Sequence, residues 1–298
     1  MLVIETNDLC KSYGDRRGIS DVNIRVEQGE IFGFLGPNGA GKSTTIRVLL
    51  GFLKATAGTA TIFGKDCWTQ SEVIKADVGY VAGDVRLYSW LTARKAFQIV
   101  SEIRHRDITA RGLLLAERFR LEVDLPVRKM SRGNRQKVAL VTALAHSPRL
   151  VILDEPTSGL DPLMQDTLMQ CLREMAEQGH TVFFSSHTLS EVDSLCDRVA
   201  IVRDGRIAAC ESLQQMKHRA PRKVSLLMNS AEDAAALNLP DFATHVSRRE
   251  NRLEFDLIGS ATELTRWAAA LDMTDIAIGQ PNLESLFRQY YQTERTAS

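Results

Sequence analysis

The sequence predicts an α/β fold with a mostly parallel central sheet, and three observations support this. Ile31–Leu35 is a continuous apolar run, typical of a strand buried on both faces, and a glycine-rich loop and a helix follow it. Leu150–Leu153 is a second such run. Elsewhere in the first two thirds of the chain, strand patterns alternate with helical patterns, as in parallel sheets covered by helices.

The predicted elements succeed one another along residues 1–218. Val22–Val26 alternates apolar and polar residues, the period of a half-buried strand. A helix is expected from about Ser43 to Leu50, and the pattern turns helical again from about 86 to 145. The other predicted elements are strands at Thr59–Phe63 and Thr181–Ser185, helices at Leu163–Gln178 and Glu191–Cys196, and a hairpin turning at Asp204-Gly205.

A second, smaller domain is predicted at 219–298. Composition becomes polar and basic near Gln214–Lys223, which we interpret as a linker. The pattern beyond it indicates a small α+β domain without a recognisable chemical motif. Its predicted elements are strands at Val224–Met228, Leu253–Leu257 and Ile276–Ile278, a helix at Thr262–Leu271, and a last helix beginning near Pro281.

Composition narrows the class of protein. The formal net charge of the 298 residues is zero, so no nucleic-acid partner is expected. The five cysteines are scattered without a CxxC pair, which argues against a disulfide framework and a zinc site. The N-terminus lacks a signal-peptide pattern, and no apolar run is long enough to cross a bilayer. If the protein works at a membrane, we expect it in the cytoplasm, docked on another chain.

The loop between the first apolar strand and its helix fits the pattern GxxxxGK[ST]. Its glycines let successive N–H groups point at phosphate oxygens, and the helix N-terminus favours the same anion. Lys42 is expected to neutralise phosphate charge and the Ser43 hydroxyl to ligate Mg²⁺. A chance match occurs about once in a hundred chains of this length. The predicted nucleotide-binding residues here are Gly36, Pro37, Asn38, Gly39, Ala40, Gly41, Lys42, Ser43 and Thr44.

Two carboxylates end the second apolar strand. Asp154 is expected to hold the Mg²⁺ opposite Ser43, and Glu155 to act as the general base for water. A solvated acidic pair is the alternative, but the upstream loop favours a hydrolase site. His187 comes after the neighbouring strand and is placed to reach the terminal phosphate, although a lone histidine is more often a packed or surface residue.

Together with Met130–Gln136, these motifs resemble the ABC ATPase family. That segment is similar to the family signature LSGGQ, and the order of loop, signature, acidic strand, Ser158–Asp161 and His187 also matches. The resemblance covers roughly residues 1–215. It implies a P-loop core with a β-rich N-terminal subdomain, an inserted helical subdomain at about 86–145, and two nucleotide-binding domains that sandwich two ATP molecules.

The resemblance also implies roles for individual residues. Tyr13 is expected to stack on adenine, with an ordinary surface tyrosine as the alternative. Ser131 and Gly133 are expected to contact the γ-phosphate held by a second subunit, and Asp161 to cross the interface between the two. The sequence departs from the family at Gly83, where a glutamine is usual; Asp84, the next residue, is the candidate to take over its metal contact. Arg132 replaces the first signature glycine.

The C-terminal segment Pro281–Phe287 is similar to tails on stand-alone subunits of ABC-2-type exporters. We therefore expect an ATPase subunit that drives a separate membrane permease, which docks at about Asp84–Thr92 through Leu87, Tyr88, Trp90 and Leu91. Packing of these side chains in the core is the alternative. An importer subunit, a non-transport ABC ATPase of the translation or DNA-repair type, and a binding module without ATPase activity also remain open. The chain does not specify the cargo.

Overall fold

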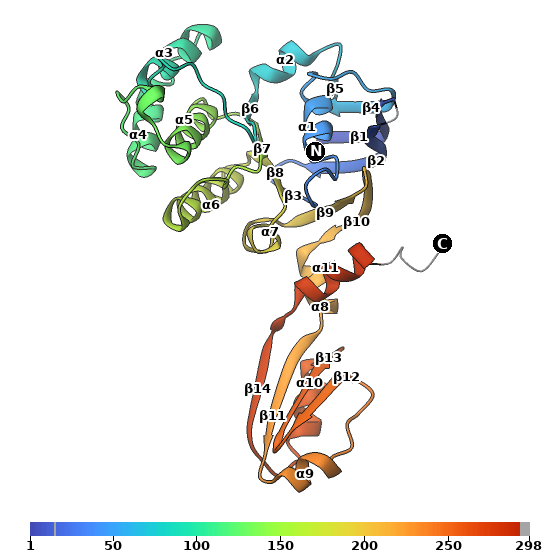
Figure 1. Ribbon diagram of the computed structural model, residues 1–298. Helices are drawn as coiled ribbons and strands as arrows, with labels where there is room; N and C mark the ends of the chain where they lie inside the picture. Colours follow the sequence, from blue (N-terminus) through green and yellow to red (C-terminus); the bar gives the residue numbers. More distant parts are fainter. Residues whose placement is uncertain (15, 293–298) are drawn as a thin grey trace. The chain divides into compact units, whose positions relative to one another are not determined.

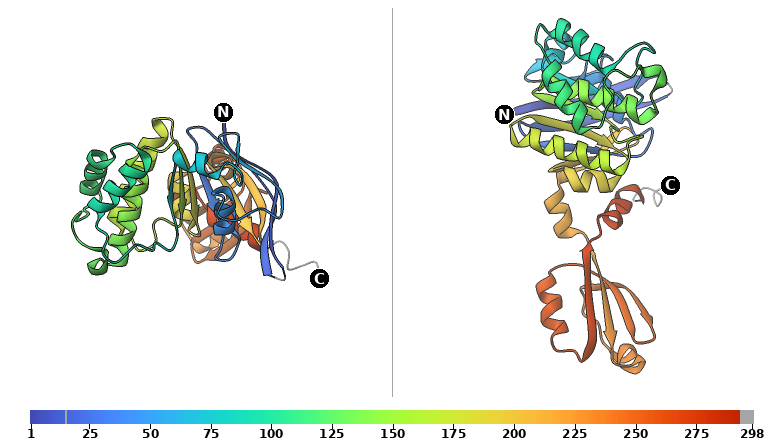
Figure 2. Two further views of the ribbon diagram at one scale, coloured as in Figure 1. Left: turned by 90° about the horizontal axis from the view of Figure 1, so that it is seen from above. Right: turned by 90° about the vertical axis from the view of Figure 1, so that its left-hand side faces the viewer.

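The computed structural model describes residues 1–14 and 16–292, and the chain divides into two compact units. The first unit is Met1–Cys210 and the second begins at Glu211. Figures 1 and 2 show the first unit in blue to yellow and the second in orange to red. Within the described ranges, none of the helices combines the length and apolar character needed to cross a membrane.

A six-stranded sheet organises the first unit, in the order β10 (Arg206–Ser212), β9 (Arg198–Arg203), β3 (Ile31–Leu35), β8 (Thr181–Ser186), β7 (Leu150–Asp154) and β6 (Val78–Val81). The pairs β9–β3, β3–β8, β8–β7 and β7–β6 are all parallel, as predicted. Every residue of β3, β7 and β8 is buried. At the Asp204-Gly205 turn both φ angles are positive, which suits the tight hairpin joining β9 to β10.

A second, antiparallel sheet of four strands completes the side of this unit that carries Gly36–Ser43, which we call the phosphate loop. Its order is β2 (Arg16–Glu27), β1 (Leu2–Tyr13), β4 (Ala57–Ile62) and β5 (Lys65–Asp66). One apolar core links this sheet, helix α1 (Lys42–Leu49) and the parallel sheet through fully buried Ile4, Val22, Phe34 and Ile46. The helix that carries the phosphate loop is therefore held between two sheets.

Figure 1 shows α3, α4 and α5 as a group to one side of the parallel sheet, whereas α6 and α7 pack against β3 and β8. Gly112 packs on the ring of Phe97, so closely that an added Cβ would lie 2.9 Å from it, which joins α4 to α3. These two helices and α5 form the helical part of the unit. The helices are α2 (Ser71–Ala76), α3 (Ala93–Arg104), α4 (Thr109–Arg118), the 3₁₀ turn η1 (Val127–Lys129), α5 (Arg132–Ala145), α6 (Pro162–Glu177) and α7 (Leu189–Leu195).

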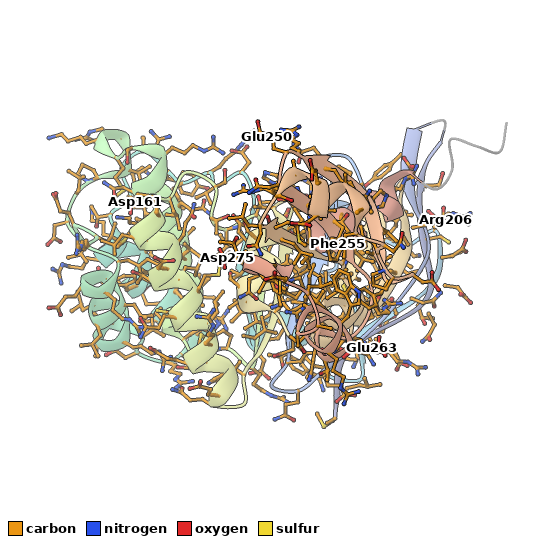
Figure 3. The ribbon with its side chains drawn as sticks, turned by 90° about the horizontal axis from the view of Figure 1, so that it is seen from below. Asp161, Arg206, Glu250, Phe255, Glu263 and Asp275 are labelled. Carbon is orange, nitrogen blue, oxygen red and sulfur yellow. The ribbon has the colours of Figure 1, made fainter. Side chains whose placement is uncertain are left out.

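The second unit is an antiparallel sheet in the order β12 (Ala243–Arg249), β13 (Arg252–Leu257), β11 (Arg222–Met228) and β14 (Met273–Pro281). Its other elements are α8 (Leu213–Arg219), α9 (Ala231–Ala236), α10 (Ala261–Ala268) and α11 (Leu283–Gln292). Val224, Leu226 and Phe255, which is labelled in Figure 3, form its core with Leu264 of α10.

The linker predicted at Gln214–Lys223 is wrong, because most of it is helix α8. Ser212 caps this helix by accepting a hydrogen bond from the Gln215 N–H at 3.2 Å. Leu213 and Met216 are buried, so the polar composition belongs to the exposed face of an amphipathic helix. The sequence reasoning also missed strand β12 and helix α9.

We expect Phe255→Ala to destabilise the second unit by about 3 to 5 kcal/mol, since it removes a buried aromatic ring from a small core. Phe255 is only 2% exposed. Chemical denaturation followed by tryptophan fluorescence of Trp267, which packs against this ring at 6.3 Å between centroids, measures the effect. An unchanged unfolding midpoint would contradict this description of the core.

Candidate functional site

The loop Gly36–Gly41 leaves buried strand β3 and enters α1. An added Cβ at Gly36 would lie 2.4 Å from the carbonyl oxygen of Val202, so only glycine fits there. Gly41 adopts a φ of 106°, which a residue with a Cβ rarely reaches. The Gly36 N–H donates to the Ser186 carbonyl at 3.2 Å, which fixes the start of the loop beside β8.

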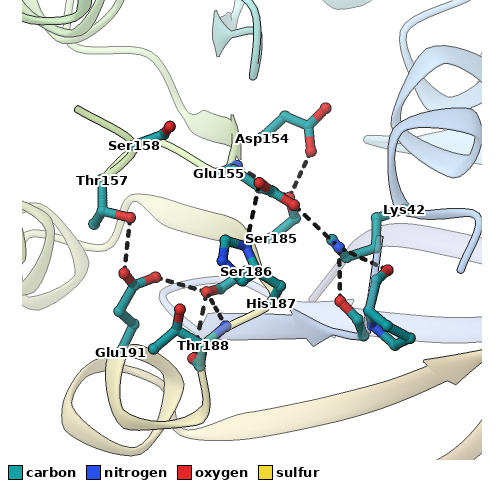
Figure 4. A network of polar contacts seen from close by, with 12 residues as sticks. Lys42, Asp154, Glu155, Thr157, Ser158, Ser185, Ser186, His187, Thr188 and Glu191 are labelled. Atoms are coloured by element: carbon teal, nitrogen blue, oxygen red, sulfur yellow. Dashed lines mark hydrogen bonds and ion pairs between the residues drawn. The ribbon is translucent and has the colours of Figure 1, made fainter. Parts of the chain in front are cut away.

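Lys42 is the buried cation of the loop, with only 5% of the residue exposed. Its Nζ donates to the carbonyls of Gly36 at 2.7 Å and Pro37 at 3.1 Å, which curls the loop around the ammonium group. The Oε1 of Glu155 lies 3.1 Å from the same Nζ (Figure 4). The phosphate loop and the acidic strand thus meet at this ion pair.

Asp154 joins the ends of strands β7 and β8 to the first turn of α1. Its Oδ2 accepts a hydrogen bond from Ser43 Oγ and its Oδ1 one from Ser185 Oγ, both at 2.7 Å. The sequence reasoning did not single out Ser185. Its pairing position, opposite Asp154 in the parallel β7–β8 register, is the signal that could have found it.

Ser43 and Asp154 provide two hard oxygen ligands side by side, which suits Mg²⁺. Among the described residues, no three acidic, histidine or cysteine side chains converge on one point as a metal site.

Glu155 and His187 form the other side of the cluster. Glu155 Oε2 lies 3.2 Å from His187 Nδ1, and both side chains are partly exposed. Glu155 has a φ of 48°, an unfavourable conformation for this residue. Its N–H donates to the carbonyl oxygen and hydroxyl of Ser185 at 3.1 and 3.2 Å, which holds this turn in place. The carboxylate therefore points toward Lys42 and His187 rather than continuing along the strand.

The signature segment begins helix α5. Ser131 is its N-cap and accepts a hydrogen bond from the Asn134 N–H at 3.2 Å. Gly133 faces the Gly159 carbonyl so closely that an added Cβ would lie 2.5 Å from it. Arg132 Nη2 donates to Ser158 Oγ at 2.8 Å. The substituted arginine thus contacts the loop after the acidic strand.

Asp161 caps helix α6, since its Oδ1 accepts a hydrogen bond from the Met164 N–H at 3.0 Å. Between described residues, no hydrogen bond or ion pair links Ser131 or Asp161 directly to Lys42 or Ser43. Ser131 and Asp161 each begin a helix, and the first N–H groups of a helix suit an anion.

Three other predicted residues have distinct surroundings. Tyr13 ends strand β1, is 41% exposed, and has Lys11 Nζ 5.5 Å from its ring centroid, so its ring is available for stacking. Thr44 is half-buried in the first turn of α1. Asp84 has an exposed carboxylate that accepts a hydrogen bond from Arg86 Nε at 2.8 Å.

Gly83, the position before Asp84, lies beside the cluster. A Cβ at Gly83 would be 3.3 Å from the Asp154 carbonyl oxygen and 3.6 Å from its Oδ2. The prediction that Asp84 replaces the missing glutamine stays a prediction. The backbone brings position 83 beside Asp154, the predicted metal ligand, and glycine supplies no side chain there.

An apolar groove of about 660 Å³ lies between α3, α5 and the segment after β6. Phe52, Tyr80, Tyr88, Trp90 and Ile103 are among its lining residues. The rings of Tyr88 and Trp90 stack with centroids 5.8 Å apart and are 73% and 50% exposed. Leu91, by contrast, is buried. The expected docking segment is thus split between exposed aromatic residues and a core leucine.

Comparisons with known proteins agree with this geometry. The ABC transporter family profile matches residues 19–158. A bacitracin transport ATP-binding protein of Bacillus licheniformis is 36% identical over 82% of this chain and 80% of its own length. A linearmycin resistance ATP-binding protein of Bacillus subtilis is 28% identical over 96% of this chain and 97% of its own length, so that alignment includes most of the second unit.

Solved structures show the same fold. An ATP-binding subunit of an ABC transporter is 30% identical, with a TM-score of 0.68 over 72% of this chain and 92% of its own. A dimeric ATP-binding cassette in a post-hydrolysis state with ADP and phosphate is 25% identical, with a TM-score of 0.66 over 70% of this chain and 98% of its own.

His146, in the groove wall, makes the first unit sensitive to acid. Burial lowers the pKa of this imidazole to about 4, and the nearby positive charge of Arg104 adds to the effect. Below pH 6.5 the unfolded chain binds a proton that the folded chain does not, so stability falls as the pH drops toward 4. This pKa shift corresponds to a loss of about 3 kcal/mol in the free energy of unfolding by pH 4.

We expect His146→Gln to flatten the dependence of the unfolding free energy on pH between 6.5 and 4, because glutamine does not titrate. An unchanged slope would contradict this expectation.

Proposed function

The chain belongs to the family of ABC transporter ATP-binding proteins, and we propose that it binds ATP with Gly36–Thr44 and hydrolyses it with Glu155 to drive a separate membrane permease. The contact that carries this proposal is the chain Lys42–Glu155–His187, with distances of 3.1 and 3.2 Å, beside the Ser43–Asp154 pair. This cluster supports the proposal that Lys42 neutralises the phosphates, that Ser43 and Asp154 bind the metal, and that Glu155 acts as the base.

ATP binding would exchange one ion pair for another. The terminal phosphates compete with Glu155 for the buried ammonium of Lys42, and N–H groups of the loop donate hydrogen bonds to the phosphate oxygens. Glu155 released in this way is free to accept a proton from water, and His187, beside it, is positioned to contact the γ-phosphate. Mg²⁺ bound by Ser43 and Asp154 would neutralise charge that develops on the phosphates.

A second copy of the nucleotide-binding domain would complete the site. Ser131 and Gly133 lie at the N-terminus of α5, and Asp161 caps α6. Presented by a partner, Ser131 and Gly133 would bind the γ-phosphate from the other side and exclude water from it, and Asp161 would cross the interface. The similar dimeric cassette with bound ADP and phosphate supports this arrangement.

Transport in the export direction fits the relatives best. One relative is named for bacitracin transport and another for linearmycin resistance, and a third, from Rhizobium etli, is named for Nod factor export. We propose that the groove beside Tyr88 and Trp90 receives an amphipathic cytoplasmic segment of the permease. Its charged lining residues, Lys75, Arg86 and Arg104, are all cationic, which favours a segment that carries carboxylates.

The Glu155→Gln variant tests the proposed chemistry. We expect it to bind ATP but to hydrolyse it at least about 100-fold more slowly, because the amide cannot accept the proton. Trapped nucleotide should then hold a dimer, seen by light scattering as a doubled mass. Lys42→Ala is the matched control and should neither bind ATP nor dimerise. A Glu155→Gln protein that turns over ATP at the wild-type rate would overturn the proposal.

Trp90→Ala tests the docking groove. We expect it to abolish stimulation of the ATPase by the reconstituted permease, since a buried interface tryptophan commonly contributes at least about 2 kcal/mol. Basal ATPase activity should stay within about twofold, because most surface substitutions change stability little. Trp68→Ala, a second exposed tryptophan outside the groove, is the control. Equal stimulation of both variants would place docking elsewhere.

A further inference from the structure

Glu191 bridges two loops of the site, and the proposed ATPase chemistry assigns it no role. Its Oε1 accepts a hydrogen bond from Thr157 Oγ1 at 2.8 Å and its Oε2 one from Ser186 Oγ at 2.6 Å (Figure 4). Thr157 and Ser186 are 6% and 1% exposed, so neither hydroxyl has ready access to water as an alternative partner. Thr157 belongs to the loop after Glu155, and Ser186 precedes His187. One carboxylate thus joins the two segments that carry the proposed catalytic groups.

The position of Glu191 in its own helix makes this bridge unusual. Thr188 is the N-cap of α7, so Glu191 is the third residue of the helix. A glutamate there commonly returns to the N-cap N–H. Here the Thr188 N–H donates instead to Ser186 Oγ at 2.8 Å. The carboxylate is therefore available to the neighbouring loops rather than to the end of its own helix.

Ser186 extends the bridge to the phosphate loop. Its hydroxyl is closer to Glu191, at 2.6 Å, than to the Thr188 carbonyl at 3.3 Å, so its proton points to the carboxylate. Its own carbonyl oxygen accepts the hydrogen bond from the Gly36 N–H at 3.2 Å. Glu191 therefore restrains the residue that contacts both the first glycine of the loop and, through the next peptide, His187.

We propose that Glu191 is a positioning residue for hydrolysis. It holds the His187 segment and the Thr157–Asp161 loop in fixed relation, so that His187 stays 3.2 Å from Glu155 when Lys42 moves to phosphate. Hydrogen bonds to a carboxylate are shorter and stronger than those between neutral groups, which suits a restraint that must persist through turnover. This inference rests on the proposed ATPase function.

Glu191→Ala should therefore lower kcat about 10- to 100-fold, because small misplacements of catalytic groups are costly. The KM for ATP should change less than about threefold, since the phosphate-binding contacts of Lys42 and Ser43 remain. Glu191→Gln should recover most of the rate. Its amide has the same shape, accepts a hydrogen bond from one hydroxyl and donates one to the other oxygen. Glu174→Ala, which breaks an ion pair with Arg118 on α4 with N–O contacts at 2.6 and 2.8 Å, is the control and should keep the wild-type kcat.

A double-mutant cycle separates positioning from general damage. Thr157→Val removes the hydroxyl that donates to Glu191, so adding it to Glu191→Ala should lower kcat no further. A wild-type kcat in Glu191→Ala would overturn the inference. So would fully additive effects, or a loss of ATP binding and thermal stability that Glu191→Gln does not restore. An inactive wild-type protein, or an active Glu155→Gln variant, would instead contradict the proposed function itself.

Discussion

The site depends on a buried ammonium group that needs negative charge around it. Lys42 is almost fully enclosed, and an enclosed charge is tolerated only when it is paired and hydrogen-bonded. The carbonyls of Gly36 and Pro37 and the carboxylate of Glu155 meet that need here. Because these partners come from the loop and from the strand after the signature helix, the same requirement brings distant segments together. A phosphate group can meet it equally well, and this exchange is the physical basis for the coupling that we propose between nucleotide binding and release of Glu155.

The parallel sheet brings residues that are distant in the sequence together in this cluster. In β3, β8 and β7 the chain runs in one direction, so Leu35, Ser186 and Asp154 all emerge at one edge. The segment after each of these strands is therefore a piece of the site: the phosphate loop, His187 and Glu155. The hydroxyl of Ser185 ties Asp154 to its neighbour, and Glu191 ties the loops beyond the strand ends. The geometry of the site is defined by the register of the parallel strands and by a few hydrogen bonds to carboxylates.

The parallel α/β core and the helix after the phosphate loop could be predicted because they rest on local signals, namely apolar runs and glycine spacing. The sequence predicts that Ser43 and Asp154 share a metal ion and that Lys42 and Glu155 both act at the phosphates. It does not predict that these side chains contact each other, because the two contacts join residues 111 and 113 positions apart. The Glu191 bridge carries no local signal at all, because a glutamate early in a helix normally indicates a cap. The prediction for Gln214–Lys223 failed for the opposite reason. Its polar composition hid the buried residue Met216, which lies at helical spacing from buried Leu213 just before the segment.

A crystal structure with Mg²⁺ and a non-hydrolysable ATP analogue tests the central claim most directly. Lys42 Nζ should leave Glu155 for the terminal phosphates, Ser43 and Asp154 should ligate the metal, and Glu155 should face the γ-phosphate. A nucleotide bound elsewhere, or a Lys42–Glu155 pair that persists beside bound phosphate, would contradict the account.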